Sequence, residues 1–163
     1  MSLRQVTSNE DQRDLFVDFV EYTIKTLDNY NRATDKKIRL NVNKIVDDNA
    51  VETGIFPVIC VTCIGHSEEP ISLGGQSRKF KITLRGNIWY YHEKLATVQK
   101  HKEIMLALGT ITAILRGNRT LSGFAHDLNI LGSLLRPNIV KDVLISGGLV
   151  IFEAEKIIRQ DMV

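Results

Sequence analysis

The chain has 163 residues, of which 44% are hydrophobic and 25% are charged, and its formal net charge is +2. These values are ordinary for a globular protein and predict one domain over residues 1–163. The small charge excess does not favour nucleic acid as a default partner. No apolar run approaches the roughly 20 residues that span a bilayer, and the polar N-terminus lacks a signal-peptide core. With two cysteines in the chain, we expect a reducing cytoplasm as its location.

Two segments have the apolar periodicity of amphipathic helices. Apolar residues recur at steps of three and four in residues 11–27 and again in residues 97–116. This spacing places them on one face of each helix. Gly117 follows the second segment, and a glycine there is expected to end the helix in the left-handed conformation.

Six further segments predict β-strands, because their apolar residues either alternate or form short β-branched runs. They are residues 38–42, 55–64, 79–91, 128–135, 140–146 and 149–157. Gly86 predicts a bulge in the third strand, and Gly147 with Gly148 predicts a tight turn between the last two. The strands come in two runs of three, each run after a helix. The sequence therefore predicts an α+β fold, a mainly antiparallel β-sheet flanked by two principal α-helices in the order α-β-β-β-α-β-β-β.

Residues 65–77, GHSEEPISLGGQS, are polar and contain two adjacent glycines. A segment of this length and composition between two strands is typical of a functional or mobile loop. We therefore expect a functional loop that is mobile in the free chain. Its candidate contact residues are His66, Glu68, Glu69, Gly74 and Gly75.

Two clusters contain residue types that carry chemistry in other proteins. Cys60 and Cys63 lie in a predicted strand, where a separation of three places them on opposite faces. Without a second cysteine pair, buried structural cysteines are favoured over a zinc or redox site. Ser122, His126 and Asp127 are too close in sequence for a catalytic triad, and we expect them in the turn that leads into the next strand. The sequence thus predicts no catalytic residue, no metal site and no cofactor.

A basic stripe begins the third predicted strand. Its residues are Arg78, Lys79, Lys81 and Arg85. Alternation in a strand places Lys79, Lys81 and Arg85 on one face, with Arg78 beside them. Such a face is either simply solvated or lies near DNA or an acidic partner, so the stripe is a candidate interface or DNA-proximal surface.

Four segments of the second half resemble one protein family. They are KFKITLRGNIWYYHEK, EIMLALGTITAILRGN, RTLSGFAHDLNILGSL and GGLVIFEAEKI. Together they resemble the tail terminator proteins of long-tailed siphophages of the lambda type, over residues 80–157. In that family a strand with an aromatic pair precedes a helix. The helix ends in a short N-x-T-L-x-G turn, and a strand then leads to a C-terminal hairpin.

The resemblance implies a structural virion protein rather than an enzyme. In the family, a hexameric ring caps the growing tail tube, stops its polymerisation and presents a surface to the head. The implied partners are therefore further copies of this chain, the tail tube protein and a head connector or head-completion protein. Phage DNA passes through the ring, and a chain that is monomeric in dilute solution is compatible with this role. The implied location is the virion tail, after assembly in the host cytoplasm.

Two other classes stay open at the level of the sequence. One is a small nucleic-acid-binding module that uses the strand from Arg78 to Arg85, for which steep salt dependence would be the signature. The other is an enzyme of a type that the motifs do not reveal, for which a ligand in a deep pocket would be the sign.

Overall fold

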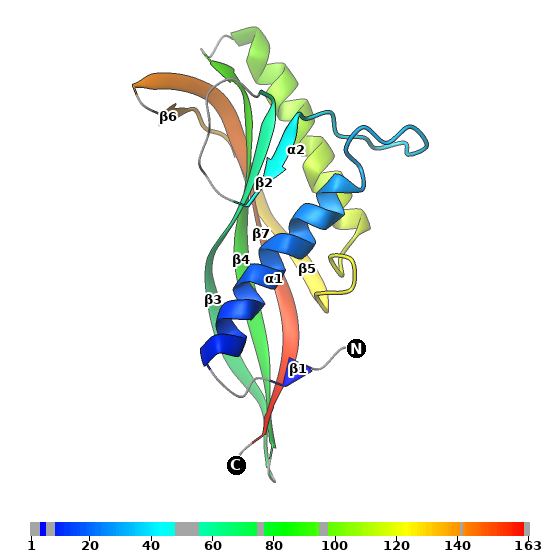
Figure 1. Cartoon of the computed structure of the whole chain (residues 1–163), viewed down its shortest axis with the longest axis vertical. Coiled ribbons are helices and arrows are strands. Elements are labelled where there is room, and N and C mark those ends of the chain that lie inside the picture. The colour runs from blue at the N-terminus through cyan, green and yellow to red at the C-terminus, as the bar shows by residue number, and fades with distance from the viewer. Residues whose placement is uncertain are drawn as a thin grey trace.

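The fold is described by a computed structural model that covers residues 4–5, 9–47, 56–74, 77–94, 98–140 and 142–161. Within these residues, two helices cross one face of a long, twisted sheet (Figure 1). The helices are α1 (Asn9–Asp28) and α2 (Val98–Gly117). The strands are β1 (Arg4–Gln5), β2 (Lys44–Val46), β3 (Val58–Gly74), β4 (Ser77–Lys94), β5 (Asp127–Leu135), β6 (Asn138–Val140) and β7 (Val143–Asp161). The predicted α+β class and element order are confirmed, with the short β1 added before α1.

The centre of the sheet consists of three long antiparallel strands, β3, β4 and β7, with β4 in the middle. The outer edge of β7 pairs with β6, β5 and β1 in turn, whereas the outer edge of β3 pairs with β2 only at Val58–Cys60. Beyond that short ladder, no described strand pairs with this edge of β3, and none pairs with the outer edge of β5. Among the described residues, the sheet therefore has an open strand edge on each side.

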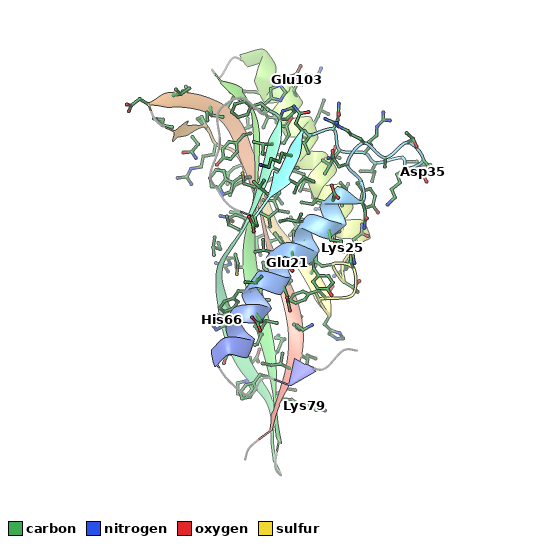
Figure 2. All side chains as sticks on the ribbon, viewed as in Figure 1. Glu21, Lys25, Asp35, His66, Lys79 and Glu103 are labelled. Atoms are coloured by element: carbon green, nitrogen blue, oxygen red, sulfur yellow. The ribbon has the colours of Figure 1, made fainter. Side chains whose placement is uncertain are left out.

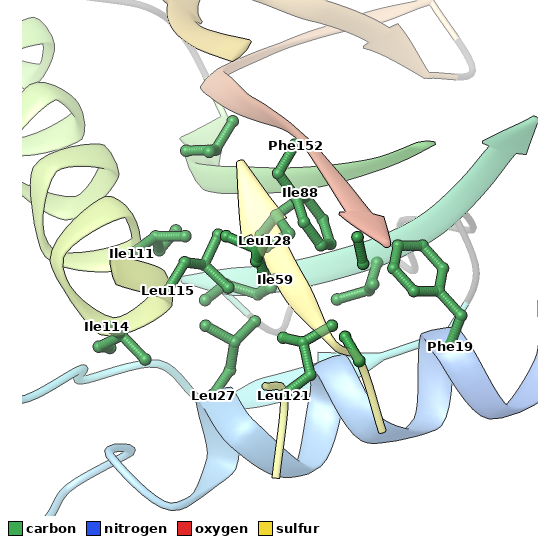
Figure 3. Packing of buried hydrophobic residues seen from close by; sticks show 14 of the residues in the cluster. Phe19, Leu27, Ile59, Ile88, Ile111, Ile114, Leu115, Leu121, Leu128 and Phe152 are labelled. Carbon is green, nitrogen blue, oxygen red and sulfur yellow. The ribbon is translucent and has the colours of Figure 1, made fainter. Parts of the chain in front are cut away.

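The main core lies between the helices and the sheet, as Figure 3 shows from close by. The apolar stripe of α1 contributes Leu15, Phe19 and Leu27, all fully buried. That of α2 contributes Ile104, Leu108, Ile111, Ile114 and Leu115, all at most 4% exposed. Full burial of each such side chain is worth roughly 1.5–3 kcal/mol, so this shared layer fixes both helices on the sheet.

A second, smaller core lies on the opposite face of the sheet and includes Cys60 and Tyr91. Cys63, three residues further along β3, packs instead against the main core. The prediction that the two cysteines point to opposite faces is therefore confirmed. Neither of them forms a disulfide.

The prediction of a loop over residues 65–77 is wrong. β3 continues to Gly74 and pairs in register with β4, with His66 opposite Leu84 and Glu68 opposite Ile82. The strand looks like a loop in the sequence because its side chains from Gly65 to Ile71 are exposed, so nothing selects apolar residues there. Backbone pairing with β4, rather than burial, holds this part of the strand. Of the five candidate contact residues, Gly75 lies outside the described residues.

The predicted turn at Gly147 and Gly148 is also wrong, because β7 runs through both residues. A Cβ at Gly147 would lie 2.5 Å from the carbonyl oxygen of Tyr90, and one at Gly148 would lie 2.7 Å from the side chain of Leu108. These glycines thus allow β4 and α2 to approach β7 closely. The turn comes earlier, between β6 and β7, where Asp142 has a positive φ of 62°.

The strand predicted at residues 38–42 begins later, at Lys44. Its alternation is real, since Leu40 and Val42 are buried while their neighbours are exposed. However, the Asn31 side chain hydrogen-bonds both the N–H and the carbonyl oxygen of Val42, at 3.0 and 3.2 Å. The Asn31 side chain thus pairs with Val42, while Leu40 forms backbone hydrogen bonds with Tyr30 and Arg32 in an isolated bridge instead of a strand ladder.

Two glycine predictions need a similar correction. Gly117 is the last residue of α2 and does not have a positive φ; the left-handed residues come later, at Leu121, Ser122 and Gly123. The irregularity expected at Gly86 lies on its partner strand, where the register shifts between Cys63 and Gly65.

Candidate assembly surfaces

The predicted basic stripe lies on β4 as one part of a ladder of mixed charges. Arg85 donates from Nε and Nη2 to Oε1 of Glu153 at 3.2 and 2.7 Å. The ammonium of Lys81 lies 3.3 Å from Glu69 and 3.8 Å from Glu155. The carboxylates come from both neighbouring strands, so this face is close to electrically balanced.

The remaining stripe residues lie nearer the tip of the sheet. Lys79 is exposed and pairs across the ladder with Ser72 and Arg159 (Figure 2). Arg78 lies on β4 opposite Leu73, and its side chain is not described.

The described residues that were expected in a mobile loop lie on β3 instead, and three of them have defined partners. The ring of His66 packs against that of Phe16 on α1, tilted by 49° with centroids 4.9 Å apart, and His66 Nε2 lies 3.5 Å from Glu68. Glu69 contacts Lys81, so two candidate sites that the sequence kept separate meet in one cross-strand pair. Gly74 is the last residue of β3.

The segment after α2 contains Ser122, His126 and Asp127, which the sequence analysis weighed as a catalytic triad. Ser122 Oγ lies 3.0 Å from Thr26 Oγ1, and Arg119 donates two hydrogen bonds to Asp127, at 2.8 and 3.1 Å. The hydrogen bond from Arg119 lowers the pKa of Asp127. The backbone N–H of His126 donates to the carbonyl of Glu155. The segment is a turn into β5, as predicted.

A polar network that the sequence did not reveal joins β4 to α2. Tyr90 Oη lies 3.0 Å from His92 Nδ1, and His92 Nε2 lies 2.6 Å from a carboxylate oxygen of Glu103. Burial, together with the nearby charge of Glu103, raises the pKa of Tyr90 to about 12. The spacing of His92 and Glu103 gave no signal, because they meet only when α2 folds back onto the sheet.

One open edge of the sheet is apolar. On β5, Leu131, Leu134 and Leu135 are 44%, 42% and 38% exposed, and Ile139 on the adjacent β6 is 69% exposed. We call these four residues the β5 edge surface. The sequence LNILGSLL carries more apolar residues than a strand with one buried face needs. This excess is the sequence signal for an exposed apolar edge.

The other open edge lies beside a groove. Between α1 and β3, a groove of ≈ 330 Å³ is lined by Phe16, Val17, Val20, Glu21, Asp47, Thr62 and Cys63. We call it the α1–β3 groove. Val17 is half exposed, and burial raises the pKa of the Cys63 thiol. Periodicity assigned the apolar residues of α1 to the core, so the groove was not foreseen.

Comparison of the chain with protein-family models and with curated proteins found no match. In the part of the chain that the structure describes, no three His, Cys, Asp or Glu residues gather to hold a metal ion. No described helix is long and apolar enough to cross a membrane.

Proposed function

We propose that this chain is the subunit of a ring that caps a phage tail tube, as in the lambda-type terminators that its second half resembles. The observation that carries the proposal is the pair of unlike open edges on opposite sides of one sheet, an apolar edge at β5 and a grooved edge at β3. A ring requires a heterologous interface, in which one patch of each subunit meets a different patch of the next.

In this role the chain acts by covering the end of the tube. Six chains of 18.4 kDa would form a ring of about 110 kDa. One side of the ring would cover the last tube subunits and stop further polymerisation. The other side would present a surface to the head connector, and DNA would pass through the lumen.

The alternative of a nucleic-acid-binding module has less support. Phosphate binding needs cations that are available, but Lys81 and Arg85 already contact carboxylates. Lys79 is the exposed member of the stripe for which no such contact is present among the described side chains. The stripe therefore fits a structural ladder better than a phosphate-binding face.

The test is to delete the reading frame of this chain in a phage that encodes it and to image the products by electron microscopy. We expect tubes of uncontrolled length that are not attached to heads. Supplying the chain from a plasmid should restore tails of uniform length. Tails of normal length joined to heads in the deletion phage would overturn the proposal.

A further inference from the structure

We infer that the β5 edge surface of one copy docks along the open edge of β3 in the next copy and fills its α1–β3 groove. The occupant of the groove is therefore a second copy of this chain. The inference rests on the proposed ring and names the two surfaces that would close it.

The backbone provides the first argument. β2 pairs with β3 only at Val58–Cys60, and the groove lies directly beyond this ladder, beside Thr62 and Cys63. An incoming strand would take the position next to β3 beyond this ladder, which no described strand occupies. β5 offers a nine-residue strand whose outer edge no described strand pairs. Unpaired N–H and C=O groups on two such edges favour the addition of one to the other.

The side chains provide the second argument. The groove has apolar walls from Phe16, Val17 and Val20, and Val17 is 50% exposed. On the other side of the sheet, Leu131 and Leu134 are exposed to a similar degree. Contact between these surfaces removes apolar area from water on both copies, whereas a polar partner would leave that area unmatched.

The charges provide the third argument. Glu21 and Asp47 line the groove and are exposed, and Figure 2 labels Glu21 on α1. Arg116, at the end of α2 beside β5, and Arg136, directly after β5, are exposed as well. None of these four side chains forms an ion pair with another described residue. An acidic groove and a basic edge are complementary between copies, and like surfaces repel each other.

The two surfaces lie on opposite sides of the sheet, so the contact runs head to tail (Figure 1). Each copy uses its groove once and its edge once. Such a contact forms a ring when the rotation between neighbours closes. A symmetric dimer, in contrast, would have to join two like surfaces.

Charge reversal tests the pairing. The groove variant carries Glu21→Lys with Asp47→Lys, and the edge variant carries Arg116→Glu with Arg136→Glu. Each alone brings like charges together at every contact, so self-association measured by sedimentation should weaken about tenfold or more. In an equimolar mixture, alternating copies match at every contact, and assembly should return. An alternating ring closes only with an even number of subunits, which a hexamer satisfies.

Asp35→Lys with Lys37→Glu changes charges in an exposed segment away from both surfaces and should leave association unchanged. If the mixture of folded variants does not assemble, or if the groove variant associates like the wild type, the docking is overturned. The same conclusion follows if the groove variant loses binding to purified tube protein while its self-association is intact, since the tube protein would then be the occupant.

A cysteine pair covers the case in which the wild-type chain stays monomeric in solution. Val17→Cys with Leu134→Cys should give oxidised ladders of up to six chains on purified tails. Intact tails without such ladders would overturn the docking and leave the proposed capping function untouched. Ladders from a chain whose deletion leaves tails normal would support the docking and overturn the capping function instead.

Discussion

At the residue scale, Gly86 shows how one absent side chain permits the core. Gly86 lies on the helix-covered face of β4, where an added Cβ would meet the ring of Phe152 at 2.8 Å and that of Phe19 at 2.9 Å. These two rings pack on each other with centroids 5.4 Å apart. The glycine therefore serves close approach rather than the bulge that the sequence suggested.

This gives a matched pair of substitutions. Gly86→Ala should destabilise the chain by about 1–3 kcal/mol, because two buried rings must shift. Gly109→Ala, at an exposed position of α2 with no atom within 4 Å of the new Cβ, should stabilise it by about 0.5–1 kcal/mol. Urea unfolding measures both. Equal effects of the two substitutions would contradict the packing described at Gly86.

Tyr90 gives a prediction for alkaline pH. Its pKa of about 12 lies above the ordinary value of 10.0, because burial and the charge of Glu103 disfavour the phenolate. A raised folded-state pKa means that this group's contribution to stability is complete below pH 10.0 and is lost as the pH rises through about 12.

Ultraviolet titration checks this. Tyr90→Phe should remove one phenolate from the phase near pH 12 and leave the earlier phases unchanged. Glu103→Gln should shift that phase to lower pH while Tyr90 stays buried. If Tyr90→Phe instead removes a phenolate that titrates near pH 10, the burial of the hydroxyl group is incorrect.

At the element scale, the sequence predicts helices more reliably than strand ends. Both helices carry an apolar stripe because one face packs on the sheet, and their observed bounds lie close to the predicted ones. The distal half of β3 has no such constraint, since its side chains are exposed. Its strand structure depends on pairing with β4, and pairing leaves no periodic signal in the segment itself.

Hydrogen exchange distinguishes this strand from a loop. In an antiparallel edge strand, alternate backbone amides donate to the neighbouring strand and the others face outward. We therefore expect alternating slow and fast exchange from His66 to Glu69 in the free monomer, before Pro70 and the register shift that follows it. Uniformly fast exchange across the segment would favour the loop and contradict the register with β4.

At the scale of the whole molecule, the order of elements could be predicted but the sites could not. Periodicity along the chain indicates each helix and most strands. The partners of Arg85 and Lys81, in contrast, are set by register between segments far apart in sequence, such as β4 and β7. For the same reason, the groove and the apolar edge appear only when α1, β3 and β5 take their places in the sheet.

The mixed-charge ladder leads to a prediction about nucleic acid. Each phosphate that a protein neutralises on duplex DNA steepens the fall of log K with log salt by about 0.9. With Lys81 and Arg85 held by carboxylates, the wild-type chain should bind DNA weakly and with a shallow slope. Glu153→Gln with Glu155→Gln releases Arg85 and removes one of the two carboxylates beside Lys81, which keeps Glu69. The variant should therefore strengthen binding at low salt, with a slope steeper by about 1. Glu21→Gln with Asp47→Gln changes the net charge equally but in the α1–β3 groove rather than beside Lys81 and Arg85, and should have a smaller effect. Fluorescence anisotropy over a salt series measures all three proteins. A steep slope in the wild type that Lys81→Gln with Arg85→Gln abolishes would instead favour a nucleic-acid-binding module.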